Sequence, residues 1–268
     1  MRAVCPAAPS IMGVNQTKAK LKAGETVIGC YTRHADPGLA EVLGHYGWDY
    51  LLFDGEHTPL SSRECENLAR VCELRDVTPI VRIPANQPGL AGQFLDTGMQ
   101  GVQFPMINSE AAARAAVQAV KYPPDGERGL AAARAANYGQ QAGFHFRDHV
   151  AAANRETLVI LQIETAASIA QLPGILRAPD ADVIFIGPAD LSLSLGCPGE
   201  LNHPKVEAAF EAIVQAVTPT DKALGIMVPN AAAALHWKKR GARYIMIVME
   251  ALLGPTVREF LASTRERS

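Results

Sequence analysis

The sequence has no excess of charge of one sign and no long hydrophobic run. Its 268 residues include 25 Lys and Arg against 27 Asp and Glu, which gives a formal net charge of −2. Such a balance gives no support to binding of nucleic acid or of an anionic membrane surface. No apolar run approaches the roughly 20 residues that a membrane-spanning helix needs. We therefore expect neither nucleic acid nor membrane among the partners of this protein.

The first residues also lack the apolar segment of a secretory signal, since Met1-Arg2-Ala3-Val4-Cys5-Pro6 holds one basic residue and no hydrophobic stretch. Residues 1–14 are predicted to form a flexible tail. The five cysteines are an odd number and do not have the spacing of a metal site. This usage is typical of a reducing compartment, so we predict a cytoplasmic location.

Phosphate-binding loops are missing as well. No glycine-rich dinucleotide motif follows the first apolar run, and no Walker A motif occurs. The chain instead repeats a unit of short apolar run, turn and helical segment, which predicts an α/β fold, a TIM (β/α)₈ barrel. The eight predicted strands are Thr26–Tyr31, Tyr50–Phe53, Thr78–Arg82, Gly101–Phe104, Leu158–Ile163, Val183–Ile186, Leu224–Val228 and Tyr244–Val248.

Helical periodicity between these runs predicts one domain over residues 15–268. Ser61 and Glu64 form the pattern of a capping box, which predicts that a helix begins at Ser62. The expected helices are Ser62–Leu74, Ser109–Val120, Thr165–Leu176, Val206–Val217 and Ala231–Arg240. One insertion at about 122–156 interrupts the rhythm, and its turn-rich start predicts a segment that arches over a mouth of the barrel.

Two carboxylates follow buried runs directly. Glu164 closes the fifth predicted strand, and Asp190 closes the sixth through Gly187-Pro188-Ala189. Burying a carboxylate without a partner costs several kcal/mol, roughly, so a positive group is expected between the two. Oxygen ligands at neighbouring strand ends suit a hard divalent cation such as Mg²⁺ or Mn²⁺. The alternative is that each carboxylate caps the next helix or pairs with an arginine.

Further polar residues follow other strands on the same side of the predicted barrel. Asp54-Gly55-Glu56-His57-Thr58 comes after the second strand, and Arg82 ends the third. The carboxyl ends of barrel strands build the active sites of such folds. A histidine, an arginine and two carboxylates in one place suit a metal-bound anion and an acid/base group. Arg82 could instead bridge carboxylates structurally.

No lysine is predicted inside the barrel near the carboxyl end of a strand. A Schiff-base enzyme needs a lysine there. Lys18, Lys20 and Lys22 precede the first strand, and the remaining lysines fall on helices or before strands. The sequence therefore disfavours imine chemistry and leaves a metal as the electron sink.

Five ordered motifs resemble the HpcH/HpaI family of metal-dependent pyruvate aldolases. The similarity runs from about Leu21 to the C-terminus. The motifs are Leu51-Leu52-Phe53-Asp54-Gly55-Glu56-His57-Thr58-Pro59, Val81-Arg82-Ile83-Pro84-Ala85-Asn86, Tyr122-Pro123-Pro124 with Arg128-Gly129, Gln162-Ile163-Glu164-Thr165 and Phe185-Ile186-Gly187-Pro188-Ala189-Asp190-Leu191.

The resemblance implies a barrel of the phosphoenolpyruvate/pyruvate-binding type that reversibly cleaves a 4-hydroxy-2-oxo acid into pyruvate and an aldehyde through a metal-stabilised pyruvate enolate. It implies that Glu164 and Asp190 bind Mg²⁺, Mn²⁺ or Co²⁺. Gln162 and the backbone of Gly187, Pro188 and Ala189 are expected to line the pyruvate pocket.

The same resemblance makes His57 the general base and Arg82 the group that stabilises the enolate. It also implies that Asp96 reaches the histidine of a neighbouring subunit in a homo-oligomer, a hexamer built as a trimer of dimers that exchange their last helix. From the residues alone, Asp96 is only a carboxylate on a predicted helix.

The sequence departs from the family where the substrate is selected. The eighth strand ends in Ile247-Val248-Met249-Glu250, where many members have glycine and aspartate, and the role of Glu250 is open. Arg134, in the alanine-rich insertion, either meets the aldehyde part of the substrate or is a solvated loop residue. Oxaloacetate decarboxylation or another pyruvate-enolate lyase reaction is the alternative chemistry. A non-catalytic metabolite-binding barrel is the alternative of another class.

Overall fold

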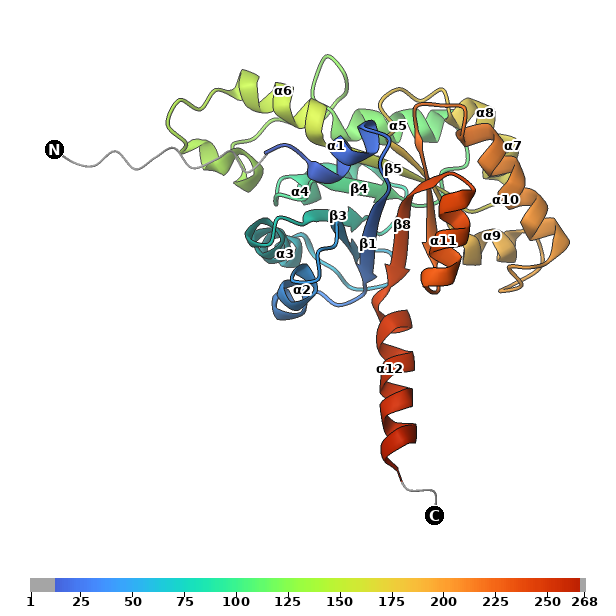
Figure 1. Ribbon diagram of the computed structural model, residues 1–268. Helices are drawn as coiled ribbons and strands as arrows, with labels where there is room; N and C mark the ends of the chain where they lie inside the picture. Colours follow the sequence, from blue (N-terminus) through green and yellow to red (C-terminus); the bar gives the residue numbers. More distant parts are fainter. Residues whose placement is uncertain (1–12, 266–268) are drawn as a thin grey trace.

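Eight short apolar runs form parallel strands that close into a barrel in the order of the sequence (Figure 1). The computed structural model describes residues 13–265. All eight predicted strands are confirmed, four of them with shifts of one or two residues at an end. The strands are β1 Val27–Thr32, β2 Tyr50–Asp54, β3 Thr78–Arg82, β4 Gly101–Phe104, β5 Leu158–Ile163, β6 Val183–Ile186, β7 Ala223–Val228 and β8 Ala242–Val248.

Alternating side chains of the strands build two separate cores. One set points into the barrel, where the rings of Tyr50 and Tyr244 stack with their centroids 4.3 Å apart. The Tyr50 hydroxyl donates a hydrogen bond of 2.9 Å to the carbonyl of Ile245, which satisfies its polar end inside the core. The other set points outward and packs against the helices. Because the strands are buried on both faces, they read as continuous apolar runs.

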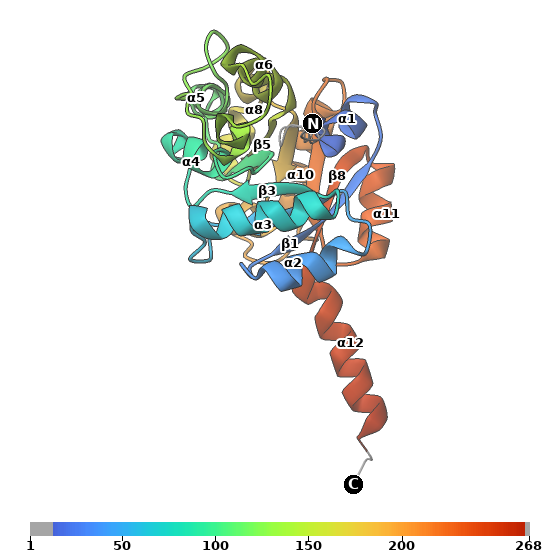
Figure 2. The ribbon, with the colours of Figure 1, turned by 90° about the vertical axis from the view of Figure 1, so that its left-hand side faces the viewer.

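Helices surround the barrel between successive strands (Figure 2). The capping box at Ser61 is confirmed. The single helix expected over Thr165–Leu176 is broken at Gln171, because Pro173 cannot continue the first segment. The α-helices are α1 Gln16–Lys22, α2 Pro37–Gly44, α3 Ser62–Leu74, α4 Ala91–Leu95, α5 Glu110–Val120, α6 Phe146–Glu156, α7 Ala166–Ala170, α8 Leu172–Ile175, α9 Pro188–Ser194, α10 Pro204–Val217, α11 Ala231–Lys239 and α12 Met249–Thr264, with 3₁₀ turns at η1 Pro88–Leu90 and η2 Arg134–Gly139.

The insertion between β4 and β5 lies at the end of the barrel where the strands begin. In Figure 1 its helix α6 is beside α1, on the opposite side of the barrel from α12. Asn154 of α6 accepts a hydrogen bond of 2.7 Å from the backbone of Tyr122, and Glu156 accepts one of 3.0 Å from the backbone of Asn15. The insertion therefore arches over the end opposite to the carboxyl ends of the strands.

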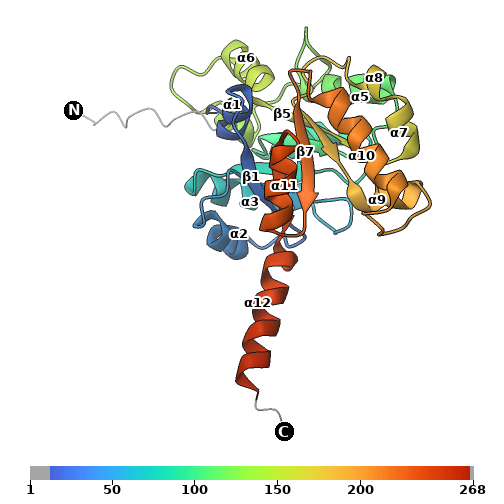
Figure 3. The ribbon, with the colours of Figure 1, turned by 45° about the vertical axis from the view of Figure 1, so that its right-hand side comes forward.

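Helix α12 leaves the barrel instead of returning along it. All three ribbon views show it extending away from the end of β8 (Figures 1, 2 and 3). None of its residues is buried, although Leu253, Val257 and Phe260 are apolar. Within residues 13–265, no helix combines the length and the hydrophobicity needed to cross a bilayer.

Two further sequence predictions concern the N-terminal tail and the cysteines. The predicted tail lies outside the described residues, apart from positions 13 and 14. The four cysteines in the described part of the chain, Cys30, Cys65, Cys72 and Cys197, are all free and buried. These four pack as small hydrophobic side chains.

Candidate active site

Arg82 is the centre of a polar network at the carboxyl ends of β1, β2 and β3. Its side chain is 6% exposed, and its Nε donates a hydrogen bond of 2.8 Å to Oδ1 of Asp54. Its Nη2 donates to the hydroxyl of Tyr31 at 2.9 Å, and its Nη1 lies 2.9 Å from Oε2 of Glu56. A glycine is required at position 55, because a Cβ there would lie 2.7 Å from the carbonyl oxygen of Arg82.

Asp54 and Tyr31 hold this arginine in one orientation. The Tyr31 hydroxyl donates to Oδ2 of Asp54 at 2.5 Å while it accepts from Arg82. Burial opposes the ionisation of Asp54, but the hydrogen bond and charge of Arg82 outweigh it and lower the pKa of this carboxyl. Burial alone would lower the pKa of the Arg82 guanidinium, but Asp54 and Tyr31 raise it. Arg82 is therefore a fixed positive charge at the mouth of the barrel.

Glu56 and His57 follow β2 and lie at the rim of this network. Asp54 accepts hydrogen bonds from their backbone N–H groups, at 3.0 Å from Glu56 and 3.3 Å from His57. The His57 side chain is 55% exposed, and its Nε2 lies 3.9 Å from Oε2 of Glu56. The structure thus brings His57 to the same mouth as Arg82 and leaves its imidazole open to a bound substrate.

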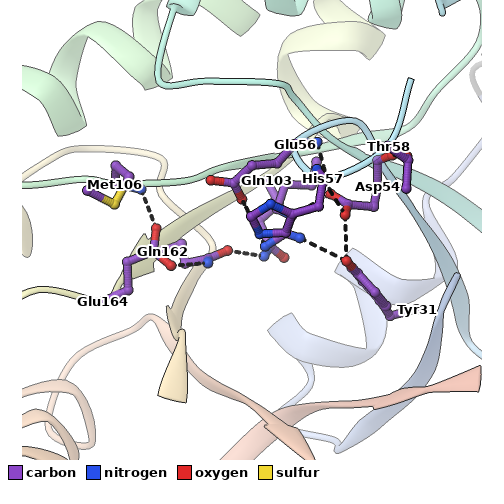
Figure 4. Close-up of polar contacts among 10 residues, drawn as sticks. Tyr31, Asp54, Glu56, His57, Thr58, Gln103, Met106, Gln162 and Glu164 are labelled. Atoms are coloured by element: carbon purple, nitrogen blue, oxygen red, sulfur yellow. Dashed lines mark hydrogen bonds and ion pairs between the residues drawn. The ribbon is translucent and has the colours of Figure 1, made fainter. Parts of the chain in front are cut away.

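Glu164 follows β5, and two hydrogen bonds hold its carboxylate. Its Oε1 accepts a hydrogen bond of 2.6 Å from the backbone of Met106, and its Oε2 accepts one from the amide of Gln162. Gln162 in turn accepts from the amide of Gln103 on β4. Figure 4 shows this chain of contacts from Met106 to Gln103, beside Glu56 and Asp54. Met106 has φ of 55°, a left-handed conformation that turns its N–H toward the carboxylate.

Asp190 lies in the first turn of α9, rather than at the end of β6 itself. The turn that connects them passes close to Glu164, since the backbone N–H of Gly187 donates to the carbonyl of Ile163 at 3.0 Å. A Cβ at Gly187 would lie 2.6 Å from Oε2 of Glu164, so only glycine fits there. Pro188 and Ala189 continue this turn and are partly or fully exposed at the mouth.

Three carboxylates at the mouth repel one another. Burial raises the pKa of Glu164, and the negative charges of Glu56 and Asp190 raise it further against its two hydrogen bonds. Burial also raises the pKa of Glu56, and the charges of Asp54 and Asp190 add to this against the effect of Arg82. One arginine therefore does not offset these effects, and an added cation would favour the ionised states of Glu56 and Glu164.

These carboxylates fit a cation seat of a particular kind. Within residues 13–265, no group of three or more His, Cys, Asp or Glu side chains is arranged to hold an ion by itself. Mg²⁺ commonly uses one or two carboxylates and completes its shell with water and substrate oxygens. Glu164, whose buried carboxylate senses the negative charge of Asp190, fits that second arrangement together with Asp190.

Two residues proposed from the sequence do not join this network. Asp96 caps α4 and accepts a hydrogen bond of 2.7 Å from Arg128, whose guanidinium lies 4.6 Å from the ring centre of Tyr122. Arg134 is buried, with Nη1 donating to the carbonyl of Thr97 at 2.8 Å and Nη2 to Glu73 at 2.5 Å. Arg134 is thus neither a solvated loop arginine nor free to meet a substrate.

Tyr31 and Gln103 are the functional residues that sequence reasoning missed. Each has a polar group at the end of its side chain, a hydroxyl in Tyr31 and an amide in Gln103, and lies in an apolar strand. Both side chains point into the barrel. Gln103 carried a usable signal, because an amide in a fully buried strand requires partners. Its Oε1 has none among the described residues, so a donor from a ligand or water fits there.

The chain is similar to known proteins over most of its length. Residues 27–251 match the HpcH/HpaI aldolase/citrate lyase family. The chain is 34% identical over 239 residues to a hydroxypyruvate/pyruvate aldolase of Roseobacter denitrificans. The aligned region covers 88% of this chain and 91% of the relative. It is 36% identical over 251 residues to a 4-hydroxy-2-oxo-heptane-1,7-dioate aldolase of Shigella sonnei, covering 93% and 94%. A crystal structure of an HpcH/HpaI aldolase/citrate lyase family protein from Burkholderia cenocepacia superposes with a TM-score of 0.88 at 33% identity, covering 94% of this chain and 100% of the other.

Proposed function

The chain belongs to the HpcH/HpaI aldolase/citrate lyase family, and on this premise we propose that it is a metal-dependent pyruvate aldolase. The reaction is the reversible cleavage of a 4-hydroxy-2-oxo acid into pyruvate and an aldehyde. One observation carries the proposal, namely the buried carboxylates of Glu56 and Glu164, whose pKa values are raised by burial and by the nearby charge of Asp190, beside the fixed charge of Arg82. Relatives named as aldolases for such substrates support the choice of reaction.

Glu164 and Asp190 are the proposed protein ligands of the cation, Mg²⁺, Mn²⁺ or Co²⁺. When bound, the cation supplies Lewis-acid stabilisation of negative charge on the substrate's carboxylate and keto oxygens. Gln162 and Met106 hold the Glu164 carboxylate in place through the hydrogen bonds described above. The turn formed by Gly187, Pro188 and Ala189 lines the pyruvate side of the pocket, where the absence of a Cβ at Gly187 leaves room beside Glu164.

Arg82 is proposed to stabilise the oxygen on which negative charge develops. Its orientation is already fixed by Asp54 and Tyr31, so no reorganisation is needed as the charge forms. Such a preorganised donor is worth about 3 kcal/mol in comparable sites. Tyr31 and Asp54 are thus positioning residues that act through Arg82.

His57 is proposed to take the proton from the 4-hydroxyl group. The C3–C4 bond then breaks, its electron pair moves into the enolate of pyruvate, and the new carbonyl leaves as the aldehyde. Protonation of the enolate at C3 gives pyruvate, and the reverse sequence adds pyruvate to an aldehyde. The open imidazole of His57, with Glu56 beside its Nε2, supports this role.

A homo-oligomer is proposed from the uncovered seam of the barrel. In a (β/α)₈ barrel the helix after β8 normally covers the outside of the barrel, but α12 projects away (Figure 3). The outward side chain of Ile28 on β1 is 45% exposed, and Leu235 on α11 is 63% exposed. A second copy that lays its α12 into this seam would bury both surfaces, and a hexamer of such dimers is the proposed assembly. In this assembly Asp96 is proposed to act on a neighbouring chain.

The proposed reaction is tested by a coupled assay of pyruvate release from several 4-hydroxy-2-oxo acids, with and without a chelator. We expect release that stops with the chelator and returns with Mg²⁺ or Mn²⁺, and that is lost in His57→Asn. Absence of both pyruvate release and pyruvate–aldehyde addition with every acid and aldehyde tried would reject the proposal. The assembly is tested by light scattering of protein ending at Val248, which we expect to be smaller than the full chain.

A further inference from the structure

A second arginine lies at the mouth of the barrel, one step out from Arg82. Arg33 directly follows the last residue of β1, two positions after Tyr31. The Cζ atom of Arg33 lies 5.4 Å from the centre of the Tyr31 ring. The Cζ atom of Arg82 lies 5.3 Å from the centre of the same ring. The ring of Tyr31 is therefore in contact with both Arg82 and Arg33.

The two arginines differ in how firmly they are held. Arg82 is buried among Asp54, Tyr31 and Glu56, whereas the side chain of Arg33 is 45% exposed. The ion pair of Arg33 is with Glu250 in the first turn of α12, where Nη1 and Oε1 are 3.4 Å apart. This is longer than the roughly 2.8 Å of a close charge-assisted hydrogen bond. The guanidinium of Arg33 thus has donors available for another anion.

The position of Arg33 in the barrel fits the distal part of the substrate. The cation ligands follow β5 and β6, and in a closed ring of eight strands β1 lies across from β5. The proposed base, His57, follows β2 and acts at C4. Atoms beyond C4, which belong to the aldehyde part, therefore extend toward β1 and β8. Arg33 and Glu250 are charged residues at these two strand ends, and Nε2 of His34 also lies 3.7 Å from Oε1 of Glu250.

We propose that Arg33 binds a carboxylate at the far end of the acceptor aldehyde, and that Glu250 holds the guanidinium when no such acceptor is bound. This rests on the proposed aldolase function and adds a class of acceptor, an aldehyde that carries a carboxylate. The planar fork of arginine matches a carboxylate, which takes the place of Glu250. The buried pair of Arg134 with Glu73 removes Arg134 as the residue for this task.

The test compares charged and uncharged acceptors in the addition to pyruvate. Glyoxylate and succinic semialdehyde are the charged probes, and glycolaldehyde and butanal are their uncharged counterparts. For Arg33→Met we expect kcat/KM with at least one charged acceptor to fall about 10- to 100-fold, mainly through KM. With the uncharged acceptors the change is expected to stay within about threefold. Arg147→Met, which removes a guanidinium that is 91% exposed on α6, should leave all four values unchanged.

Two further variants sharpen the assignment. Glu250→Gln removes the carboxylate that competes with the acceptor for Arg33, and it should raise kcat/KM for the charged acceptors about threefold. Arg33→Lys keeps the charge without the fork and should retain part of the selectivity. If Arg33→Met fails to fold, these two variants carry the test. An unchanged ratio of charged to uncharged kcat/KM in all folded variants would overturn the inference.

Exchange of the C3 protons of pyruvate in D₂O separates the two proposals, because it needs no acceptor. If the unaltered enzyme with Mn²⁺ exchanges these protons but the Arg33 and Glu250 variants keep its acceptor ratio, the enolising function stands and the inference fails. If the unaltered enzyme neither exchanges protons nor uses any acceptor, the proposed function fails.

Discussion

The two ends of the barrel treat buried charge in different ways. At the end where the strands begin, Lys18 is nearly buried and pairs with Asp182 at 2.9 Å while donating to the carbonyl of Thr157 at 2.7 Å. Arg243 there donates to the carbonyls of Leu21 and Lys222. At the mouth, the charge of Asp190 acts on the buried carboxylates of Glu56 and Glu164, and Arg82 is the one positive group fixed beside them among the described residues. Charges that are matched stabilise the fold, whereas charges left unmatched in a shaped site indicate a missing ligand.

The contrast is not complete, because one charge at the first end is also poorly compensated. A cleft of about 710 Å³ there is lined by Lys18, Lys22 and Lys121 together with Asp180, Asp182 and Asp221. Lys121 is buried and donates to the carbonyl of Asn154. Burial, together with the charges of Lys18 and Lys22, lowers its pKa to about 8. Each end thus holds buried groups whose charged form is disfavoured. At the mouth these are carboxylates with raised pKa values, and at the other end it is a lysine with a lowered pKa.

Removal of a mouth carboxylate should have the largest effect on activity. In Glu164→Ala we expect kcat/KM to fall by about a thousandfold or more, because the cation loses one of two protein ligands. The assay is pyruvate release at a saturating Mn²⁺ concentration. The matched change at the other end, Asp182→Asn, should leave the activity of folded enzyme within about threefold. Chelator-sensitive turnover that survives in Glu164→Ala would contradict the ligand assignment.

Loss of Arg82 should affect both activity and stability. Arg82→Met leaves the buried carboxylate of Asp54 without its cation, so the free energy of unfolding should fall by about 3 to 5 kcal/mol. Urea unfolding followed by circular dichroism measures this change. Arg147→Met is the control and should stay within about 0.5 kcal/mol of the unaltered protein. A stability loss as small as that of the control would show that Asp54 does not depend on Arg82.

Loss of Lys18 should separate stability from function. Lys18→Met leaves Asp182 unpaired and removes the donor to Thr157, so the free energy of unfolding should fall by about 2 to 4 kcal/mol. Pyruvate release per folded molecule should not change, because this ion pair lies at the opposite end of the barrel from His57. A drop in activity of the folded variant would show that the two ends are coupled.

The unmatched carboxylates should make the stability of metal-free protein depend on pH. The folded pKa values of Glu56 and Glu164 are raised above the ordinary carboxyl value of 4.5, so in this range the folded state binds more protons than the unfolded state. The free energy of unfolding therefore falls as pH rises from about 4.5 through the raised values. Thermal melts across this range should show the fall, and Mn²⁺ or the double change Glu56→Gln with Glu164→Gln should reduce it. An equal slope in all three samples would contradict the account.

Lys121 should produce the opposite slope at high pH. Its folded pKa, about 8, lies below the ordinary lysine value of 10.5, so between these values the unfolded state binds more protons. The free energy of unfolding contributed by this residue therefore rises with pH across that window, by about 2 to 3 kcal/mol. Comparison of Lys121→Met with the unaltered protein by urea unfolding at pH 7.5 and 10 measures it. A variant that keeps the full rise would assign it to other groups.

Much of the fold could be predicted because barrel strands are buried on both faces. Runs such as Leu158–Ile163 are apolar throughout and stand out from the amphipathic helices. The rule that strand carboxyl ends converge also predicted that His57 and Arg82 share a mouth with Glu164 and Asp190. The break in the helix after Glu164 was missed because periodicity alone does not register the effect of Pro173.

The remaining parts depend on contacts that the sequence does not display. Tyr31 reads as an ordinary core aromatic, and only the three-dimensional arrangement places its hydroxyl between Asp54 and Arg82. Arg134 reads as a loop residue because its partner, Glu73, is 61 positions away. The direction of α12 was not predictable from its own pattern, because the apolar face that it presents finds no cover among the described residues of its own chain.

The central claim is that Glu164 and Asp190 together hold a divalent cation, and calorimetric titration of Mn²⁺ into chelator-treated protein tests it most directly. We predict one saturable site per chain in the unaltered protein and in Asp182→Asn. In Glu164→Ala and in Asp190→Ala the affinity should fall by at least about tenfold. Equal Mn²⁺ affinity in all four proteins, or no saturable binding in any of them, would contradict the account.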